Sequence, residues 1–161
     1  MISAVDTTAI DAGAPLTIHF LGNILTFRAR YADTKENFTV IEMTTAPGAG
    51  SPPHTQTDQE AFLVQEGLYE ITVGNNVKQC GPGDFVHVAP GELHMFRNIA
   101  ETPSKMLLIN FPGDLHEGFF LAVGDQLPFG TTDFPEMLPP DVPKIVAAGE
   151  RFGIIIPPPA S

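Results

Sequence analysis

Short apolar and alternating runs recur between residues 16 and 111, and each run is closed by glycine, proline, asparagine or aspartate. Strict alternation of apolar and polar residues predicts half-buried strands. Strands spaced evenly by such turn residues are typical of antiparallel sandwiches and barrels rather than βαβ sheets. The predicted strands are 16–20, 24–30, 38–44, 60–65, 68–73, 84–88, 94–98 and 105–111.

The pattern becomes helical after residue 111. Asp114 and Glu117 have the spacing of a capping box, apolar residues follow on one helical face, and Gly124 can end the helix. A proline-rich connector over 128–140 leads to a second helix, with Asp141 and Pro143 at its start and an end near residue 152. We therefore predict one domain over 1–161, with a barrel at about 16–111 and a helical extension at about 113–153.

Charge and composition narrow the classes of partner. The 161 residues include 19 acidic and 8 basic ones, which gives a net charge of -11. Such a surface repels nucleic acid and anionic lipid, so neither is an expected partner. The single cysteine excludes an intramolecular disulfide, and the sequence shows no signal peptide or membrane-spanning run. A cytoplasmic location is the expectation.

Two segments carry the candidate chemistry. The first contains His54, Gln56 and Glu60, and the second contains His94. Side chains two apart on a strand face the same way, so these four residues converge inside the barrel if the two segments pair. Imidazoles with a carboxylate suit a first-row divalent ion, namely iron, manganese, nickel, copper or zinc. The sequence thus predicts a metal site.

The two segments resemble the motifs of the cupin superfamily, G(x)5HxH(x)3-4E(x)6G and G(x)5PxG(x)2H(x)3N. Gln56 departs from them by replacing a histidine, and Pro90 lies one place late. The stretches LTIHFLGN, EAFLVQEG and FPG extend the resemblance to single-domain quercetin 2,3-dioxygenase-like cupins. The residues that match are Gly48, His54, Glu60, Gly67, Gly83, Gly91, His94 and Asn98.

This resemblance implies an all-β cupin fold, a double-stranded β-helix or jelly-roll barrel, with short C-terminal helices. It implies an ion held by His54, Gln56, Glu60 and His94, and a dioxygenase acting on a small phenolic or other aromatic substrate. In the resembled enzymes the substrate hydroxyl binds the metal, the glutamate takes its proton, and dioxygen attacks the ring. Glu60 would then be both ligand and catalytic base.

Gln56 keeps two other functions open. An amide oxygen binds borderline ions more weakly than an imidazole does, so a non-oxidative lyase or isomerase and a ligand-binding cupin without catalysis are alternatives. Phe62 and Phe96 share the parity of Glu60 and His94, and either line an aromatic substrate pocket or simply fill the barrel. His87 is expected to be a hydrogen-bonded core or interface histidine rather than a ligand, and His19 and His116 are expected to pack or to lie at the surface.

An oligomer is also expected. The stretch 16–27 is apolar, and an exposed edge strand needs cover. Small cupins commonly dimerise through strands at one end of the barrel, so we predict a homodimer formed through this stretch.

Overall fold

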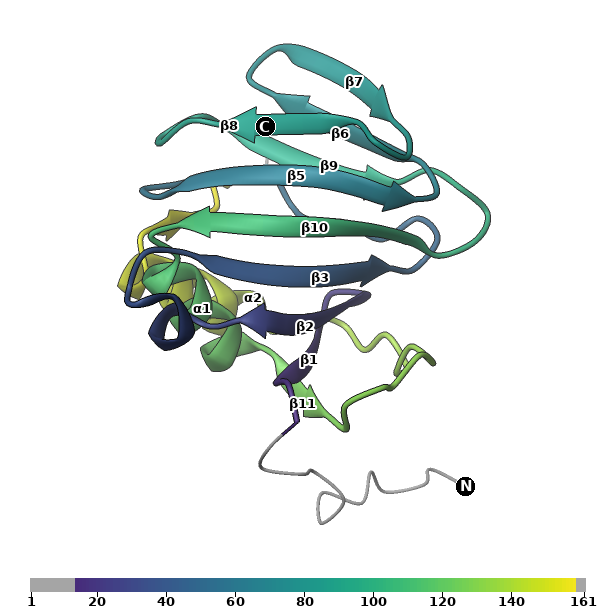
Figure 1. Ribbon diagram of the computed structural model, residues 1–161. Helices are drawn as coiled ribbons and strands as arrows, with labels where there is room; N and C mark the ends of the chain where they lie inside the picture. Colours follow the sequence, from purple (N-terminus) through teal and green to yellow (C-terminus); the bar gives the residue numbers. More distant parts are fainter. Residues whose placement is uncertain (1–13, 159–161) are drawn as a thin grey trace.

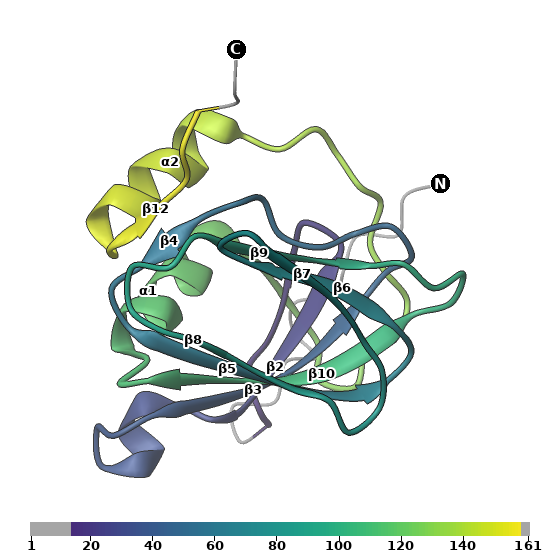
Figure 2. The same cartoon turned by 90° about the horizontal axis from the view of Figure 1, so that it is seen from above.

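The computed structural model describes residues 14–158, which fold into an antiparallel barrel with two helices beside it (Figures 1 and 2). A large sheet curves along one side, and a smaller one faces it. In spatial order, the large sheet contains β11 (Asp125–Leu127), β1 (Thr17–Phe20), β2 (Asn23–Ala29), β3 (Thr39–Thr45), β10 (Ser104–Phe111), β5 (Gln59–Glu66) and β8 (Phe85–Val88). The smaller sheet contains β7 (Asn76–Cys80), β6 (Tyr69–Val73) and β9 (His94–Asn98).

A third, two-stranded sheet closes one end of the barrel. Its strands are β4 (Thr55–Gln56) and β12 (Ile154–Ile155), and Figure 2 shows them beside the barrel with the second helix. The helices α1 (Asp114–Val123) and α2 (Val142–Arg151) pack against each other. A short 3-10 helix, Tyr31–Thr34, follows β2.

The core lies between the two sheets because their strands alternate inward and outward. Every second residue of β3 and β10 is buried. Both strands carry apolar side chains at the middle of this inward row, including Ile41 and Met43 on β3 and Leu108 on β10. The largest apolar side chains that are almost wholly buried, Phe62 and Tyr69, come from β5 and β6. Burial of such side chains stabilises the fold by about 1.5–3 kcal/mol each.

Each predicted strand is present, and its ends differ from the prediction by at most one residue. β7 was not predicted, because four of its five residues are exposed and the sequence NVKQC has no apolar alternation. It forms because a tight turn at Gly74 and Asn75 folds it back onto β6. β4, β11 and β12 were also missed, since strands of two or three residues carry no periodic signal.

The two predicted helices lie where the pattern placed them, but the first begins differently. Gly113 is the N-cap of α1, with no side-chain cap, so the predicted capping box of Asp114 and Glu117 is wrong. Glu117 instead forms an ion pair with Arg30 and accepts the backbone N–H of Tyr31 at 3.2 Å. Contacts with residues distant in sequence therefore replace the predicted cap at the helix N-terminus. α2 is capped as predicted, since Asp141 accepts the N–H of Lys144 at 3.1 Å.

The apolar stretch 16–27 forms β1 and β2. β11 pairs with the outer side of β1, so β1 is not an edge strand. The homodimer through this stretch stays a prediction. Within residues 14–158, no helix combines the length and the hydrophobicity that a membrane span requires.

Candidate metal centre

A polar row enters the barrel along one segment. Residues 54, 56, 58 and 60 are all buried, whereas 55, 57 and 59 are more exposed, so alternation continues from β4 through the turn into β5. All four inward side chains are polar or charged: His54, Gln56, Asp58 and Glu60. A buried polar row needs partners, because an unpaired polar group in the interior costs about 1–3 kcal/mol.

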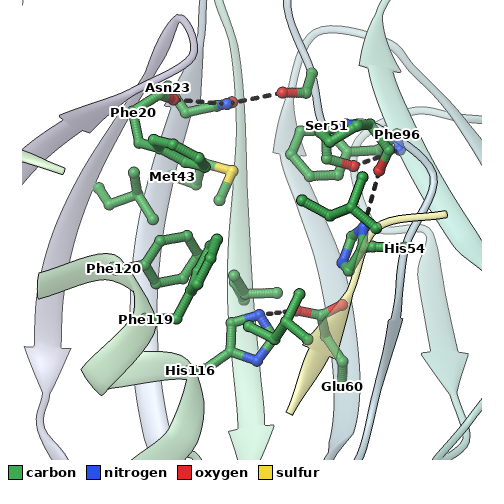
Figure 3. A pocket seen from close by; sticks show the side chains of 16 residues that line it. Phe20, Asn23, Met43, Ser51, His54, Glu60, Phe96, His116, Phe119 and Phe120 are labelled. Carbon is green, nitrogen blue, oxygen red and sulfur yellow. Dashed lines mark hydrogen bonds and ion pairs between the residues drawn. The ribbon is translucent and has the colours of Figure 1, made fainter. Parts of the chain in front are cut away.

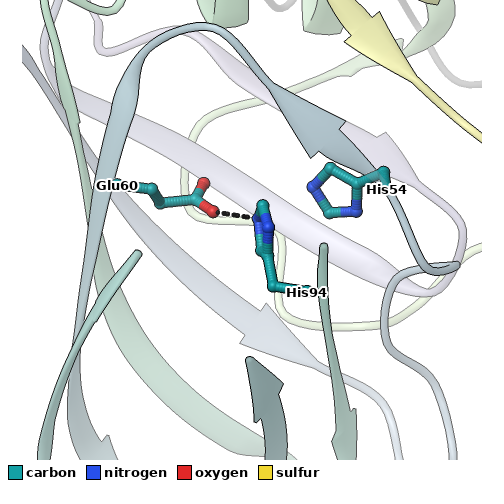
Figure 4. A group of neighbouring side chains, drawn as sticks. All are labelled: His54, Glu60 and His94. Atoms are coloured by element: carbon teal, nitrogen blue, oxygen red, sulfur yellow. Dashed lines mark hydrogen bonds and ion pairs between the residues drawn. The ribbon is translucent and has the colours of Figure 1, made fainter. Parts of the chain in front are cut away.

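His94 is brought to this row by backbone pairing. His54 and His94 form an antiparallel bridge, in which each backbone N–H donates to the other residue's carbonyl, at 3.1 and 3.0 Å. Their imidazole rings therefore lie side by side, with centroids 4.2 Å apart. Glu60 approaches from β5, and Figure 4 shows the three side chains converging.

His54, Glu60 and His94 form a set whose ligand atoms all lie within 4.8 Å of one another, and all three residues are buried. The Nδ1 atom of His54 faces the carbonyl of Pro52 at 2.9 Å, and that of His94 faces the carbonyl of Glu92 at 2.8 Å. A carbonyl can only accept, so each Nδ1 carries the proton and leaves Nε2 to bind an ion.

The contact between His94 and Glu60 supports this assignment. Nε2 of His94 lies 2.8 Å from Oε2 of Glu60, so both ring nitrogens of His94 face acceptor oxygens. A neutral imidazole has one N–H and cannot donate to both. A second proton or a metal ion can satisfy Nε2 and Oε2 together. Two imidazoles and one carboxylate are donors that a borderline divalent ion accepts, so these residues fit the expected metal.

The protonation states also favour an ion. Burial, followed by the neighbouring His94, lowers the pKa of His54 to about 4. Burial alone would raise the pKa of Glu60, but the hydrogen bond with His94 and the nearby imidazoles outweigh it and lower that pKa to about 2. At neutral pH His54 is therefore neutral and Glu60 is ionised, which are the forms that bind metal.

Gln56, the fourth predicted ligand, is buried next to this set. Its backbone pairs with Ile154 of β12, and its Nε2 donates to the carbonyl of Asp58 at 3.5 Å. Among the described residues, its Oε1 atom has no hydrogen-bond partner. An unpaired buried oxygen is suited to a water molecule or an ion, but coordination by Gln56 stays a prediction.

Three polar residues beside the set were missed by the sequence reasoning. Asn110 of β10 donates from Nδ2 to Oε1 of Glu60 at 3.1 Å. His116 of α1 lies with Nε2 3.6 Å from the same oxygen, and its Nδ1 is 3.3 Å from Oδ1 of Asp58. Asp58 shares the parity of Glu60, and Asn110 interrupts an apolar inward row, so a signal existed for both.

His116 was expected to pack or to lie at the surface, and it is buried in the polar cluster instead. Burial alone would lower its pKa, but the hydrogen bond to Asp58 and the charge of Glu60 outweigh burial and raise it. No pattern in the sequence could place it there, because a helix outside the barrel has no fixed parity with the strands.

A cavity opens beside the metal set. His54, Glu60 and His116 contribute polar groups to its wall, and Figure 3 shows aromatic side chains facing them. The cavity has a volume of about 50 Å³, and one water molecule needs about 10–15 Å³. The space therefore suits a few water molecules or a single small ring. Its apolar lining comprises Phe20, Leu25, Met43, Pro52, Phe96, Leu108, Phe119, Phe120, Ile154 and Ile156.

The two predicted pocket aromatics lie differently. Phe96 lines the cavity. Phe62 is almost wholly buried between the rings of His94 and Phe96, at centroid distances of 6.4 and 5.9 Å, and it is not part of the cavity wall.

Comparison with known proteins places the fold. Residues 41–110 match the family model of the cupin domain. Similar solved structures include an RmlC-like cupin from Shewanella frigidimarina, at 16% identity and a TM-score of 0.55 over 65% of this chain and 91% of that one. A polyketide cyclase from Streptomyces resistomycificus has 19% identity and a TM-score of 0.53 over 70% of this chain and 80% of that one.

A variant of oxalate decarboxylase from Bacillus subtilis is also similar, at 19% identity and a TM-score of 0.56 over 62% of this chain and 28% of that one. At these identities the likeness concerns the fold alone. No curated protein matches the chain in sequence. The predicted cupin fold, mostly β with two short and mainly C-terminal helices, is thereby confirmed.

Proposed function

We propose that this chain, residues 41–110 of which match the cupin domain, is a metal-dependent, dioxygenase-like enzyme acting on a small phenolic or other aromatic substrate. One observation carries this proposal: His54 and Glu60 belong to the metal set and also line a cavity that is otherwise mainly apolar and aromatic. A ring held in that cavity has its polar substituent next to the ion-binding groups.

The protein's own groups set up the reaction. When bound, a redox-capable divalent ion would acidify the substrate hydroxyl and supply the electron transfer that oxygenation requires. His54, Glu60 and His94 would hold that ion. The apolar wall from Phe96, Phe119 and Phe120 orients the ring and excludes bulk water, which strengthens the electrostatic interactions inside.

Glu60 is the proposed proton acceptor. Oε2 faces His94, while Oε1 accepts the amide of Asn110 and lies beside His116 on the cavity side. A carboxyl group with a pKa of about 2 is a weak base. Glu60 therefore takes a proton only from a hydroxyl that is already acidic, such as a phenol next to an ion.

The size of the cavity supports a single-ring substrate. The space beside the metal set suits a few water molecules or one small ring, and four phenylalanine rings line it. The finer proposal is therefore a monocyclic phenol, with one hydroxyl directed at His54 and Glu60.

Metal analysis and oxygen uptake test the proposal together. Protein purified without chelator should contain about one divalent ion per chain and consume oxygen with one member of a monocyclic phenol panel. Glu60→Gln should lose the ion and the uptake. The matched control is Glu66→Gln, at the exposed far end of β5, and it should keep both. Wild-type protein with no ion and no uptake would contradict the proposal.

A non-oxidative lyase or isomerase is the second candidate, and Gln56 is the observation that favours it. Replacing one imidazole by an amide reduces electron donation to the ion but leaves its Lewis acidity. Two of the similar structures are a polyketide cyclase and an oxalate decarboxylase. Proteins of similar fold thus carry out different reactions. Substrate turnover without oxygen would favour this candidate, and binding without turnover would favour a ligand-binding cupin.

A further inference from the structure

Few of the polar groups on the cavity wall are free to contact a ligand. Asn23 is committed, because its Nδ2 donates to the carbonyls of Phe20 and Gly50 and its Oδ1 accepts the hydroxyl of Thr45 at 2.8 Å. Ser51 is committed only as an acceptor, since its Oγ accepts the backbone N–H of Phe96 at 3.2 Å while its O–H can still donate. The remaining polar side chains on the wall are His54 and Glu60, which belong to the metal set, and His116, which does not.

The two ring nitrogens of His116 differ, because Nδ1 lies 3.3 Å from both Asp58 and Asn110, whereas Nε2 forms only one long contact. Nδ1 faces Oδ1 of Asp58 at 3.3 Å, and both residues are buried. Nε2 is 3.6 Å from Oε1 of Glu60, which is longer than a hydrogen bond. His116 also lies outside the set whose ligand atoms fall within 4.8 Å of one another. Figure 3 shows the imidazole at the cavity wall, joined to Glu60 by this long ion-pair contact, so Nε2 has no hydrogen-bond partner among the described residues.

Helix geometry joins His116 to two aromatic rings. Phe119 and Phe120 lie three and four residues further along α1, so all three side chains project from one face. The imidazole and the ring of Phe120 are 5.3 Å apart between centroids, and the rings of Phe119 and Phe120 are 5.7 Å apart. This face presents one hydrogen-bonding nitrogen beside two apolar rings, which is the pattern of a monocyclic phenol.

We infer that His116 is a substrate-binding residue, which hydrogen-bonds the oxygen of a monocyclic phenol while Phe119 and Phe120 pack against its ring. Asp58 is its positioning residue, since it fixes the ring orientation of His116. An imidazole nitrogen can accept from a phenol or donate to a phenolate, so the contact exists in either protonation state. This inference rests on the proposed function, because it assigns a substrate contact within the same site.

Two probes of equal shape test the contact. 4-Fluorophenol and 4-fluorotoluene differ only in hydroxyl against methyl, and fluorine NMR titration gives a Kd for each. The titrations use metal-free and zinc-loaded protein, since zinc has no redox chemistry. A site built to bind a hydroxyl rejects the analogue without it, so wild-type protein should prefer 4-fluorophenol by about tenfold or more.

The preference should depend on His116 and not on histidines elsewhere. His116→Leu should reduce it by about fivefold or more while 4-fluorotoluene still binds. Asp58→Asn should reduce it by about threefold, because the imidazole loses its anchor but keeps its nitrogen. The matched control is His87→Leu, on the exposed outer face of β8, and it should leave the preference unchanged.

The outcomes separate this inference from the proposed function. An unchanged preference in His116→Leu overturns the inference, and so does loss of zinc from that variant, which would make His116 part of the metal centre. Absence of binding of both probes to wild-type protein overturns it as well. If His116→Leu does not fold, the phenol preference of Asp58→Asn is the test, and an unchanged preference overturns the inference. Wild-type protein without metal or oxygen uptake, but with a phenol preference that depends on His116, contradicts only the proposed function.

Discussion

Two buried polar clusters occupy different levels of the same barrel, and they differ in how completely they are hydrogen-bonded. The closed cluster consists of Asn23, Thr45, Tyr69, Asn98 and Ser104. The open cluster consists of His54, Gln56, Asp58, Glu60, His94, Asn110 and His116. β9 and β10 contribute to both, through Asn98 and Ser104 to the closed cluster and through His94 and Asn110 to the open one.

The closed cluster is saturated. Asn98 donates to the carbonyls of Thr45 and Thr102 and accepts from Ala100 and Ser104, at 2.7–3.0 Å. Tyr69 donates to the hydroxyl of Thr45 at 2.9 Å. None of its buried side-chain atoms lacks a partner in the described part of the chain.

The open cluster is not saturated. Oxygens of Gln56, Asp58 and Asn110 are buried without a partner among residues 14–158, and the contacts of His116 are 3.3 Å or longer. Satisfied polar networks fix a unique structure, whereas unsatisfied buried groups call for a water, an ion or a ligand. Saturation therefore distinguishes the closed cluster from the open one.

The largest expected effect is the difference in stability between two matched asparagine substitutions, one in each cluster. Asn98→Ala leaves several buried backbone and hydroxyl groups without partners, so the free energy of unfolding should fall by about 3 kcal/mol or more. Asn110→Ala removes one bond to Glu60 and one unpaired oxygen, so the loss should be nearer about 1 kcal/mol. Urea denaturation measures both, and equal losses would contradict the comparison.

Acid should weaken the open cluster next. Burial, followed by the neighbouring His94, lowers the pKa of His54 from its ordinary value of 6.5 to about 4 in the folded protein. Between pH 6.5 and 4, His54 is protonated in the unfolded chain but not in the folded protein. The free energy of unfolding therefore falls by about 3 kcal/mol at most.

This acid effect is measured on metal-free protein, so that ion binding adds no pH dependence. His116 acts in the opposite direction, because its raised pKa favours the folded state at low pH and that contribution is lost as pH rises. His54→Gln tests the contribution of His54. In this variant, the free energy of unfolding should decline less steeply between pH 6.5 and 4. The same slope in both proteins would show that His54 is not the source.

Gln56→His should have a smaller effect, on metal affinity. If the side chain at position 56 reaches the ion, an imidazole in place of the amide should tighten zinc binding by roughly tenfold. Calorimetric titration of both proteins gives the ratio. An unchanged Kd would mean that Gln56 lies outside the coordination sphere and that its unpaired Oε1 serves another partner.

Tyr69→Phe should have the smallest effect of these substitutions. It removes one hydrogen bond from the closed cluster, but the hydroxyl of Thr45 keeps Asn23 as its partner. The loss in the free energy of unfolding should be about 1 kcal/mol, and metal affinity should not change. Parallel denaturation and metal titration check both, and a change in metal affinity would show that the two clusters are coupled.

Much of this architecture follows from alternation. The convergence of His54, Glu60 and His94 was predicted on the condition that two distant segments pair, which the structure shows as the bridge between His54 and His94. The predicted strands required only parity and turn residues. Those rules act along one strand or between neighbours, so a single sequence displays them. β7 escaped because an exposed strand needs no apolar face.

Asp58 and Asn110 had a local signal, but His116 and Glu117 depended on contacts that no local rule describes. His116 enters the cluster because α1 packs across the barrel end, and the register of that packing is tertiary. Glu117 forms an ion pair with Arg30 instead of capping α1, and this long-range contact has no local sequence signal. Whether Gln56 contacts an ion depends on ångström-scale placement that spacing does not encode.

β12 has a consequence for engineering. Ile154 and Ile156 line the cavity, yet they lie outside the two barrel sheets, on a segment that pairs only with the short β4. The shape of the cavity can therefore be redesigned at two positions without altering the strands that build the barrel. The other wall residues Leu25, Met43, Phe96 and Leu108 belong to the barrel core as well, so design can reshape only the part of the wall that β12 and its C-terminal neighbour supply.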